Sequence, residues 1–420
     1  MEDNVSMNNL PKGLSIAGLV LGIVSLVFVW IPILGLILAI TGTALGAKGI
    51  SDANKGKGAG KGMAIGGLVT GIVSIVLSII VLLAVAVPTY FALTENTYAK
   101  TGVGIAEWCP DLCKGQMNLD GGTVDIGLPQ MSIQDAVESG IKSMIIGTAS
   151  IGGGIPAAWL ETLEEAARAG LDIVAGVHSK LIDQPSLRAA AKDSGATLID
   201  VRVPPVDLPV GTGKKRTGKR LLTVGVDCAL GKKYSALALE RDMKSAGVNV
   251  DFRASGQTGI MIAGTGLPID SVVADFISGA AEMLSPNNTD DHWDVIEGQG
   301  SIFHPGYAGV SMGLLTGSQP DAFVACTEAG RTHIEGWPHF ELPTIEALIE
   351  RTTAVGKPFN ADIRCVGICV NTSSLSDTER TQYLESLSKR TGLPCVDPLK
   401  GGTGPIIAHM NSVYSVLGQK

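Results

Sequence analysis

The stretch RLLTVGVDCALGKKYSALALERDMKSAG, residues 220–247, decides the fold of the 420-residue chain. Its apolar start predicts a buried strand, its glycine-flanked middle predicts a turn, and its amphipathic end predicts a helix that stops at Gly247. In that order, free backbone N–H groups and the positive end of the helix dipole point at one anion. The stretch therefore predicts a phosphate-binding loop in a parallel α/β sheet.

The loop departs from the usual nucleotide-binding form. Five residues separate Gly225 from the Gly-Lys pair at 231–232, one more than in the Walker loop, and Lys233 stands where a Ser or Thr would bind magnesium. The longer form with Asp227 in third place resembles the dethiobiotin synthetase branch of the P-loop proteins. The first hydroxyl group on the helix side is that of Ser235, two residues late for a metal ligand.

From residue 88 onward, short β-rich runs alternate with helical ones, which predicts parallel α/β sheets. Before the loop, helices are predicted at 155–170 and 184–195, and strands at 88–93, 143–149, 171–177 and 196–203. From the loop onward, six strands are predicted at 220–228, 248–255, 291–300, 321–328, 365–371 and 394–399. The fold class is therefore predicted as α/β, with a Rossmann-like domain (88–212) and a P-loop NTPase-like parallel-sheet domain (213–420).

Residues 1–87 have a different character. The runs 14–46 and 63–93 contain no charged residue, and each exceeds the roughly 20 residues that span a bilayer. The first run can form one tilted helix or, broken around Pro32, two short ones. We therefore expect transmembrane helices in a hairpin, with the lipid bilayer as a partner.

The two apolar runs are copies of each other. LSIAGLVLGIVSLV (14–27) and MAIGGLVTGIVSIV (63–76) agree at nine of fourteen positions. Both copies keep two glycines four residues apart, Gly18/Gly22 and Gly67/Gly71. Such small residues predict close helix packing, although glycine is also common in apolar helices. The repeat is similar to a small family of glycine-rich membrane hairpins, a likeness that implies anchoring and no catalysis.

Charge and cysteine content exclude some classes of function. A net charge of −8 disfavours nucleic-acid binding, which relies on a basic surface. Seven cysteines, an odd number, do not form a disulfide framework and suit a reducing compartment. The pairs Cys109/Cys113 and Cys365/Cys369 lack a following His in register, so no metal site is predicted.

The stretch WDVIEGQGSIFHP, residues 293–305, carries the candidate catalytic groups. A strand that ends in an acid places Glu297 at the carboxyl edge of the sheet, where α/β proteins bind ligands. Glu297 and His304 are the candidate general bases, although the first could cap a helix and the second could be structural. The backbone N–H groups of residues 298–300 are candidate donors to an oxyanion.

The other candidate residues follow neighbouring strands or belong to the loop. Guanidinium groups bind carboxylates through two hydrogen bonds, which makes arginines at this edge candidates for substrate binding. The residues predicted to bind substrate are Arg253, Gln299 and Arg331. The residues predicted to bind the cofactor are Gly225, Asp227, Gly231, Lys232, Lys233, Ser235, Gln257 and Thr258.

The basic stretch VGTGKKRTGKR, residues 210–220, precedes the loop. It is either a solvated linker between domains or a clamp on a polyanionic ligand. In the second case Lys214, Lys215 and Arg216 would add contacts to the phosphates.

With these motifs in place, the chain resembles the D-glutamate N-acetyltransferases of the DgcN type. The likeness lies in KTGVGIAEWCPDLCKGQ (100–116), LLTVGVDCALGKKYSALALERDM (221–243), ASGQTGIMIAG (254–264), DHWDVIEGQGSIFHP (291–305) and RCVGICVNTSSL (364–375). It implies acetyl transfer from acetyl-CoA to the amine of D-glutamate. In this interpretation the loop holds the phosphates of coenzyme A and needs no hydroxyl for a metal ion. The apolar front end and the compressed first strand depart from the family.

Two alternatives stay open at this point. One is an ATP-dependent ligase or kinase of the dethiobiotin synthetase type, which would use ATP with magnesium. The other is a membrane-anchored nucleotide sensor without turnover. Homo-oligomerisation is left open.

The expected localisation is a membrane-anchored protein with cytoplasmic catalytic domains, because acetyl-CoA is cytosolic. The lysines between the apolar runs favour the opposite topology by the positive-inside rule.

Overall fold

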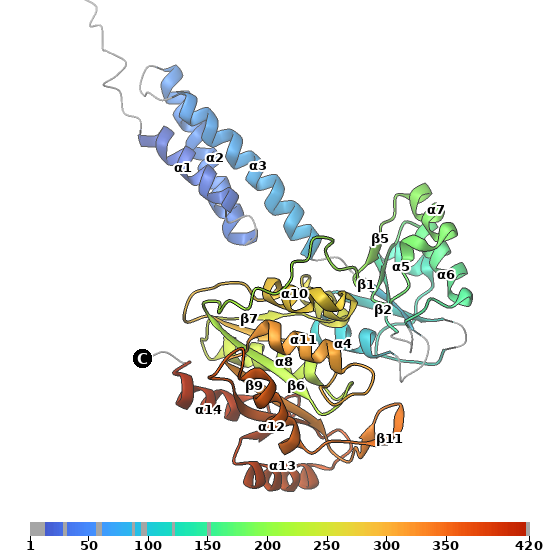
Figure 1. Ribbon diagram of the computed structural model, residues 1–420. Helices are drawn as coiled ribbons and strands as arrows, with labels where there is room; N and C mark the ends of the chain where they lie inside the picture. Colours follow the sequence, from blue (N-terminus) through green and yellow to red (C-terminus); the bar gives the residue numbers. More distant parts are fainter. Residues whose placement is uncertain are drawn as a thin grey trace, which may run out of the picture. The chain divides into compact units, whose positions relative to one another are not determined.

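The computed structural model describes residues 13–27, 32–55, 61–85, 89–93, 99–119, 122–148 and 153–416. The chain divides into two units, Met1–Pro88 and Thr89–Lys420 (Figure 1). The second unit contains two parallel sheets, and each unit is described by itself below.

The described residues of the first unit form three helices: α1 (Gly13–Val27), α2 (Pro32–Asn54) and α3 (Lys61–Val85). The first apolar run is thus divided at Pro32, as the two-helix alternative predicts. Helix α1 has 15 residues, which gives about 22 Å at about 1.5 Å per residue, and α2 includes the charged residues Lys48 and Asp52.

Within the described ranges, no helix has both the length and the apolar character needed to cross a bilayer. This finding contradicts the predicted transmembrane helices, whereas the lipid bilayer as a partner stays a prediction. The expected localisation as a protein anchored by transmembrane helices is therefore wrong.

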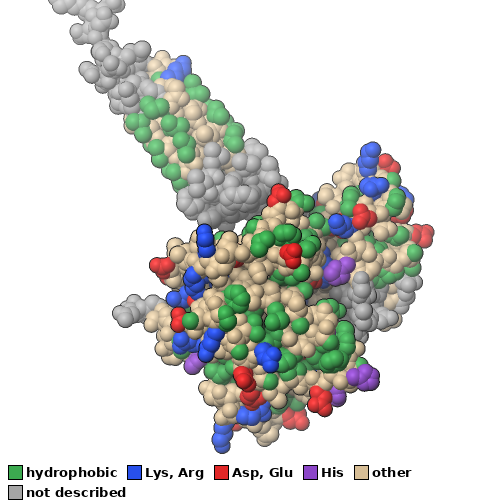
Figure 2. Space-filling model, viewed as in Figure 1, with side chains coloured by type: hydrophobic (Ala, Val, Ile, Leu, Met, Phe, Trp, Pro, Cys, Tyr) green, Lys and Arg blue, Asp and Glu red, His purple; other side chains and the backbone are tan. Residues whose placement is uncertain are grey.

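The helices of the first unit pack through glycines. A Cβ atom on Gly18 would lie 2.8 Å from the backbone nitrogen of Gly46, and one on Gly67 would lie 2.5 Å from the carbonyl carbon of Gly18. The close packing predicted from the repeated glycines is confirmed. Larger apolar side chains, such as those of Ile37 and Val69, are exposed on the outer surface of these helices (Figure 2).

The first sheet of the second unit has five parallel strands in the order β2-β1-β3-β4-β5. They are β1 (Thr89–Leu93), β2 (Cys113–Asn118), β3 (Ser143–Ile146), β4 (Asp172–Ala175) and β5 (Leu198–Asp200). Four of these strands were predicted; β2, CKGQMN, was missed because it is largely polar. The helices are α4 (Lys100–Trp108), α5 (Ile133–Glu138), α6 (Ala157–Arg168) and α7 (Pro185–Ser194), with a short 3-10 helix, η4 (Leu181–Asp183).

The second sheet has six parallel strands in the order β13-β12-β9-β6-β8-β7. They are β6 (Lys219–Gly225), β7 (Val250–Arg253), β8 (Trp293–Ile296), β9 (Ala322–Glu328), β12 (Arg364–Asn371) and β13 (Cys395–Val396). All six were predicted. An antiparallel pair, β10 (His333–Ile334) and β11 (Trp337–Glu341), was not.

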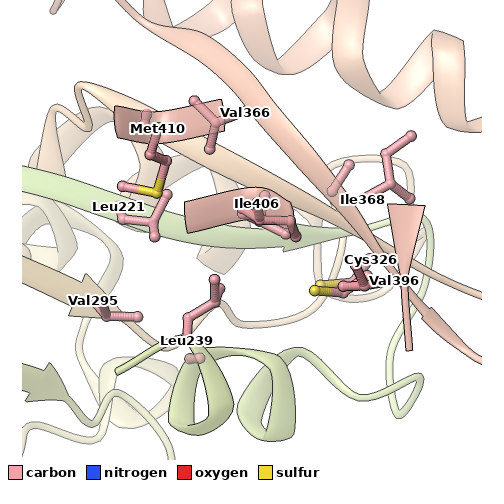
Figure 3. Packing of buried hydrophobic residues seen from close by; sticks show 14 of the residues in the cluster. Leu221, Leu239, Val295, Cys326, Val366, Ile368, Val396, Ile406 and Met410 are labelled. Carbon is pink, nitrogen blue, oxygen red and sulfur yellow. The ribbon is translucent and has the colours of Figure 1, made fainter. Parts of the chain in front are cut away.

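Helices surround this second sheet (Figure 1). They are α8 (Lys232–Ser245), α9 (Gln257–Ala263), α10 (Ile277–Leu284), α11 (Ala308–Ser318), α12 (Ile345–Gly356), α13 (Asp377–Thr391) and α14 (Gly404–Tyr414), with the 3-10 helices η5 (Ile269–Ser271) and η6 (Ala274–Phe276). Figure 3 shows part of the core, where Leu239 of α8 and Met410 of α14 belong to the same cluster as Leu221, Val295 and Ile368 of the strands. This packing holds the carboxyl ends of the parallel strands at one edge of the sheet.

Candidate active site

A cavity of about 580 Å³ lies at the carboxyl edge of the second sheet. The segments 228–235, 256–258, 297–300 and 397–400, each following a different strand, contribute to its lining together with Asn371 and Ser373. The Rossmann-like part of the unit also contributes to the cavity wall, through Lys100, Val103 and Arg202. The lining side chains include five basic and two acidic groups, so the cavity suits an anionic ligand.

The loop before α8 has the form predicted from the sequence. Strand β6 ends at Gly225 and α8 begins at Lys232, and Ala229 and Gly231 between them have φ angles of 54° and 110°. Lys232 is 6% exposed, and its Nζ donates to the carbonyl oxygen of Asp227 at 2.7 Å. The first turn of a helix leaves N–H groups without intrahelical partners. The start of α8, which lines the cavity, is therefore suited to bind a phosphate.

Asp227 stabilises this loop from behind. It is fully buried; its Oδ1 accepts from the backbone N–H of Cys228 at 2.6 Å, and its Oδ2 accepts from the N–H of Glu335 at 2.9 Å. Asp227 is not among the residues lining the cavity, and neither is Gly225. Both support the conformation of the loop.

Arg331 is paired with the same carboxylate. Its Nη1 donates to Asp227 Oδ2 at 2.8 Å and to the carbonyl oxygen of Cys228 at 3.0 Å, and its Nη2 donates to Glu328. Arg331 does not line the cavity. Its role in substrate binding stays a prediction. The contacts with Asp227 and Cys228 show that the guanidinium stabilises the loop.

Arg253 also lies outside the cavity lining. Its Nε donates to Asp294 Oδ1 at 2.7 Å, and its Nη2 contacts Asp251 at 3.4 Å. Both arginines proposed from the sequence are thus paired with acids away from the cavity wall.

Glu297 lines the cavity although it is only 4% exposed. It follows β8, and its Oε2 accepts from the backbone N–H groups of Ser255 and Gly256, each at 3.0 Å. Burial raises the pKa of Glu297 to about 7, although the charge of Lys233 and the two N–H donors oppose this shift. A carboxyl group with that pKa exchanges protons near neutrality, as a general base must.

Lys233 occupies the position of the missing Ser or Thr. Its Nζ lies 4.4 Å from the centre of the Tyr234 ring. A Cβ atom on Gly104 of α4 would lie 2.5 Å from that Nζ, so the ammonium group lies against the other domain. Burial lowers the pKa of Lys233 to about 8. Lys233 thus places a cation in the cavity where a metal-binding hydroxyl group was expected.

Two of the remaining predicted polar residues, Gln257 and Thr258, lie where the domains of the two sheets meet. Thr258 Oγ1 is 3.1 Å from Thr101 Oγ1 of α4. A Cβ atom on Gly176 would lie 2.3 Å from Gln257 Oε1. Gln299 Nε2 donates to Ser255 Oγ at 2.9 Å. Gln257, Thr258, Gln299 and the predicted loop residues Gly231, Lys232, Lys233 and Ser235 all line the cavity.

His304 lies behind the loop and is not a lining residue. Its Nδ1 accepts from the N–H of Gly306 at 3.0 Å, and its ring stacks on Tyr307 and meets the edge of Trp337. Burial lowers the pKa of His304, which favours the neutral form of the ring. The structure therefore separates His304 from the cavity that Glu297 faces.

Asp227, Cys228 and His304 bring three potential metal-ligand atoms within 4.8 Å of one another. Arg331 already donates a hydrogen bond to the Asp227 carboxylate. Burial raises the pKa of the Cys228 thiol, which disfavours the thiolate that would bind a metal ion. The group is better explained as support for the loop than as a metal site.

Two further expectations concern backbone donors and the basic stretch. The N–H of Gly298 already donates to Thr223 Oγ1 at 2.9 Å, whereas the N–H groups of residues 299 and 300 stay predicted oxyanion donors. In the basic stretch 210–220, Lys215 pairs with Asp321 at 2.7 Å, and Arg216 donates to carbonyl oxygens at the end of α11, contacts that favour the linker alternative over the phosphate clamp.

Sequence reasoning missed the contributions of Lys100, Arg202 and the segment 397–400 to the cavity. The last of these overlaps the end of the predicted strand 394–399, whereas β13 ends at Val396, so the carboxyl-edge rule with the correct strand end could have found it. Arg202 was placed within the predicted strand 196–203, whereas β5 ends at Asp200. Lys100 comes from α4, and no local pattern signals its approach to the loop.

Comparison with known proteins shows that both α/β domains match domains of one protein family. Residues 117–204 match the DUF1611 N-terminal Rossmann-like domain, and residues 209–407 match the DUF1611 C-terminal P-loop domain. The predicted Rossmann-like and P-loop parts are confirmed, while the limits at 88, 212 and 213 stay predictions. A crystal structure of a DUF1611 family protein from Anabaena variabilis is similar with a TM-score of 0.70 and 31% identity, covering 77% of this chain and 99% of that one.

Two curated relatives are similar over most of their length. A D-glutamate N-acetyltransferase of Tritonibacter scottomollicae is 45% identical over 315 residues, which cover 75% of this chain and 95% of the relative. A D-glutamate N-acetyltransferase of a Pseudoalteromonas species is 47% identical over 317 residues, which cover 76% of this chain and 96% of the relative.

Proposed function

Because the chain belongs to the DUF1611 family, with relatives named D-glutamate N-acetyltransferase, we propose that it is an N-acetyltransferase that moves an acetyl group from acetyl-CoA to the amine of D-glutamate. One observation carries the proposal at the site. The same cavity joins a phosphate-binding loop to Glu297, a buried carboxyl group whose pKa burial raises to about 7.

Acetyl-CoA fits the groups that line the cavity. Its pyrophosphate and 3′-phosphate are anions, and the start of α8, Lys232 and Lys233 offer N–H groups and positive charge. These residues would hold the phosphates. Phosphate binding without phosphoryl transfer requires no metal-binding hydroxyl, which agrees with Lys233 after the Gly-Lys pair.

Glu297 is proposed as the general base. The amine of D-glutamate is an ammonium ion near neutral pH, and it must lose a proton before its nitrogen can attack a carbonyl carbon. The Glu297 carboxylate accepts that proton, and the N–H groups of Ser255 and Gly256 keep its Oε2 in place. The thioester supplies the acetyl group: a C–N bond forms, the C–S bond breaks, and the nitrogen gives up its second proton, which balances the proton that the departing sulfur takes up to become a thiol.

The proposal is tested by a thiol-release assay on the full chain with acetyl-CoA and a panel of D- and L-amino acids. We expect release of one thiol for each N-acetyl-D-glutamate detected by mass spectrometry, and little release with L-glutamate. Parallel reactions contain ATP and magnesium in place of acetyl-CoA. ATP hydrolysis that depends on D-glutamate, without any thiol release, would favour the ligase or kinase alternative instead.

A further inference from the structure

Arg202 contributes a guanidinium group from the Rossmann-like domain to the cavity of the P-loop domain. It follows β5, which ends at Asp200, and therefore lies at the carboxyl edge of the first sheet. Its side chain is 15% exposed. A cation at this place is mostly removed from water, which strengthens its attraction for an anion in the cavity.

The hydrogen-bonding capacity of Arg202 is only partly used. Its Nη2 lies 3.2 Å from Asp270 Oδ2. Its Nε is buried and has no hydrogen-bond partner among the described residues, and the same is true of Asp270 Oδ1 and Ser271 Oγ beside it. Buried polar atoms in native proteins are normally paired. The chain therefore leaves this guanidinium incompletely paired, and because Arg202 lines the cavity, the part of the group that is still exposed is suited to a ligand that supplies an acceptor.

Arg202 lies on the side of the cavity that faces Glu297. Asp270 follows Ile269, whose N–H donates to the carbonyl oxygen of Ser255 at 3.0 Å, and the N–H of Ser255 donates to Glu297 Oε2 at 3.0 Å. Asp270 in turn pairs with Arg202. The guanidinium is thus near the proposed base rather than at the far wall formed by Asn371, Ser373 and Lys400.

The two carboxylates of an acidic amino acid need separate cations. The α-carboxylate shares its carbon with the amine, so both groups must lie near Glu297, where Lys233 is the main cation acting on that residue. The side-chain carboxylate reaches farther. Arg253 and Arg331 are paired with acids outside the lining, which leaves Arg202 as the arginine of the cavity wall.

We propose that Arg202 binds the side-chain carboxylate of the substrate and determines the preference for an acidic amino acid, a proposal that rests on the acetyltransferase function above. The fork of the guanidinium offers two parallel N–H donors, which match a carboxylate and do not match a neutral amide equally well. Arg202 is a specificity-determining residue in this proposal and takes no part in proton transfer.

The test compares R202M and R202K with the wild-type chain in the thiol-release assay, using D-glutamate and D-glutamine as acceptors. We expect R202M to raise KM for D-glutamate roughly 10- to 100-fold, with little change in KM for acetyl-CoA, and to abolish the preference over D-glutamine. R202K keeps the charge without the fork, so an intermediate loss is expected. R188M, at an exposed arginine of α7 in the same domain, is the matched control.

A second variant separates recognition from folding. D270N removes the partner of Arg202 but keeps the guanidinium, so it should keep the preference for D-glutamate even if both variants lower the melting temperature. Unchanged discrimination by R202M, or a rise in KM for acetyl-CoA alone, would overturn the assignment. If the wild-type chain neither acetylates D-glutamate nor binds it in calorimetry, the proposed function fails; if the wild type is active and R202M discriminates normally, only Arg202 is misassigned.

Discussion

At the scale of single residues, Glu297 shows how burial changes the proton affinity of a carboxyl group. A glutamate side chain in water has a pKa of about 4.3, whereas burial raises the pKa of Glu297 to about 7. Two backbone N–H donors hold it, and the cavity gives a substrate access to it. The sequence placed this acid at the sheet edge, but only the surrounding fold removes it from water.

The first prediction concerns the pH dependence of catalysis. The base is the ionised form of Glu297, which is populated above its pKa, so wild-type kcat/KM should rise with pH through about 7. E297Q should lower kcat by about 10²- to 10⁴-fold and lose this limb of the profile. Profiles of thiol release between acidic and mildly alkaline pH check both effects. E161Q, at an exposed acid of α6, is the control.

The same raised pKa has a consequence for stability. The folded state binds this proton more tightly than the unfolded state, so the contribution is fully present below the unfolded pKa and is lost as pH rises through about 7. E297Q should therefore flatten the pH dependence of the melting temperature over that range. An E297Q chain that keeps the wild-type pH–rate profile would show that another group is the base.

At the scale of elements, the short helix α9 fits closely against the proposed base. Gly259 is buried in this helix, and a Cβ atom there would lie 2.2 Å from Glu297 Oε2. Contacts under about 3 Å are not tolerated by packed atoms, so the carboxylate would have to move. A glycine at this place keeps the base aligned with its N–H donors.

The second prediction follows from that contact. G259A should lower kcat by about 100-fold, because a displacement of the base by about 1 Å costs that much, while the chain still folds. In G309A of α11 the added Cβ meets nothing within 4 Å, so activity should be unchanged and stability should rise by up to about 1 kcal/mol. Thiol release and thermal unfolding distinguish the two variants. Wild-type activity of G259A would show that the position of Glu297 is not critical.

At the scale of the whole molecule, the two units are separable in composition and in their relatives. The solved DUF1611 structure and the two acetyltransferases match 75–77% of this chain, yet 95–99% of their own lengths. The first unit, Met1–Pro88, is compact by itself. Every residue that lines the cavity belongs to the second unit.

The third prediction is that residues 1–84 are dispensable for catalysis. Their removal should leave kcat and KM within about twofold, since β1 and all lining residues remain. Removal of residues 1–98 also deletes β1, which pairs with both β2 and β3. That chain should lose the first sheet, and with it the Arg202 side of the cavity. Circular dichroism melting and thiol release check both chains; loss of activity in the shorter deletion would assign a catalytic need to the first unit.

Local patterns determined much of this protein. Residues 220–247 predicted a strand, a phosphate loop and a helix, because apolar periodicity and glycine placement act within one short segment. All six strands of the second sheet and the position of Glu297 at its edge were predicted for the same reason.

Tertiary structure decided what local patterns could not. Three residues that the sequence made candidates for the site lie outside the cavity lining because of how the chain packs: Arg253, His304 and Arg331. Arg202 and Lys100 enter the site only because two domains, distant in sequence, meet at the carboxyl edges of their sheets. Charge pairing and burial depend on neighbours far away along the chain, and these neighbours determine which side chains reach a ligand.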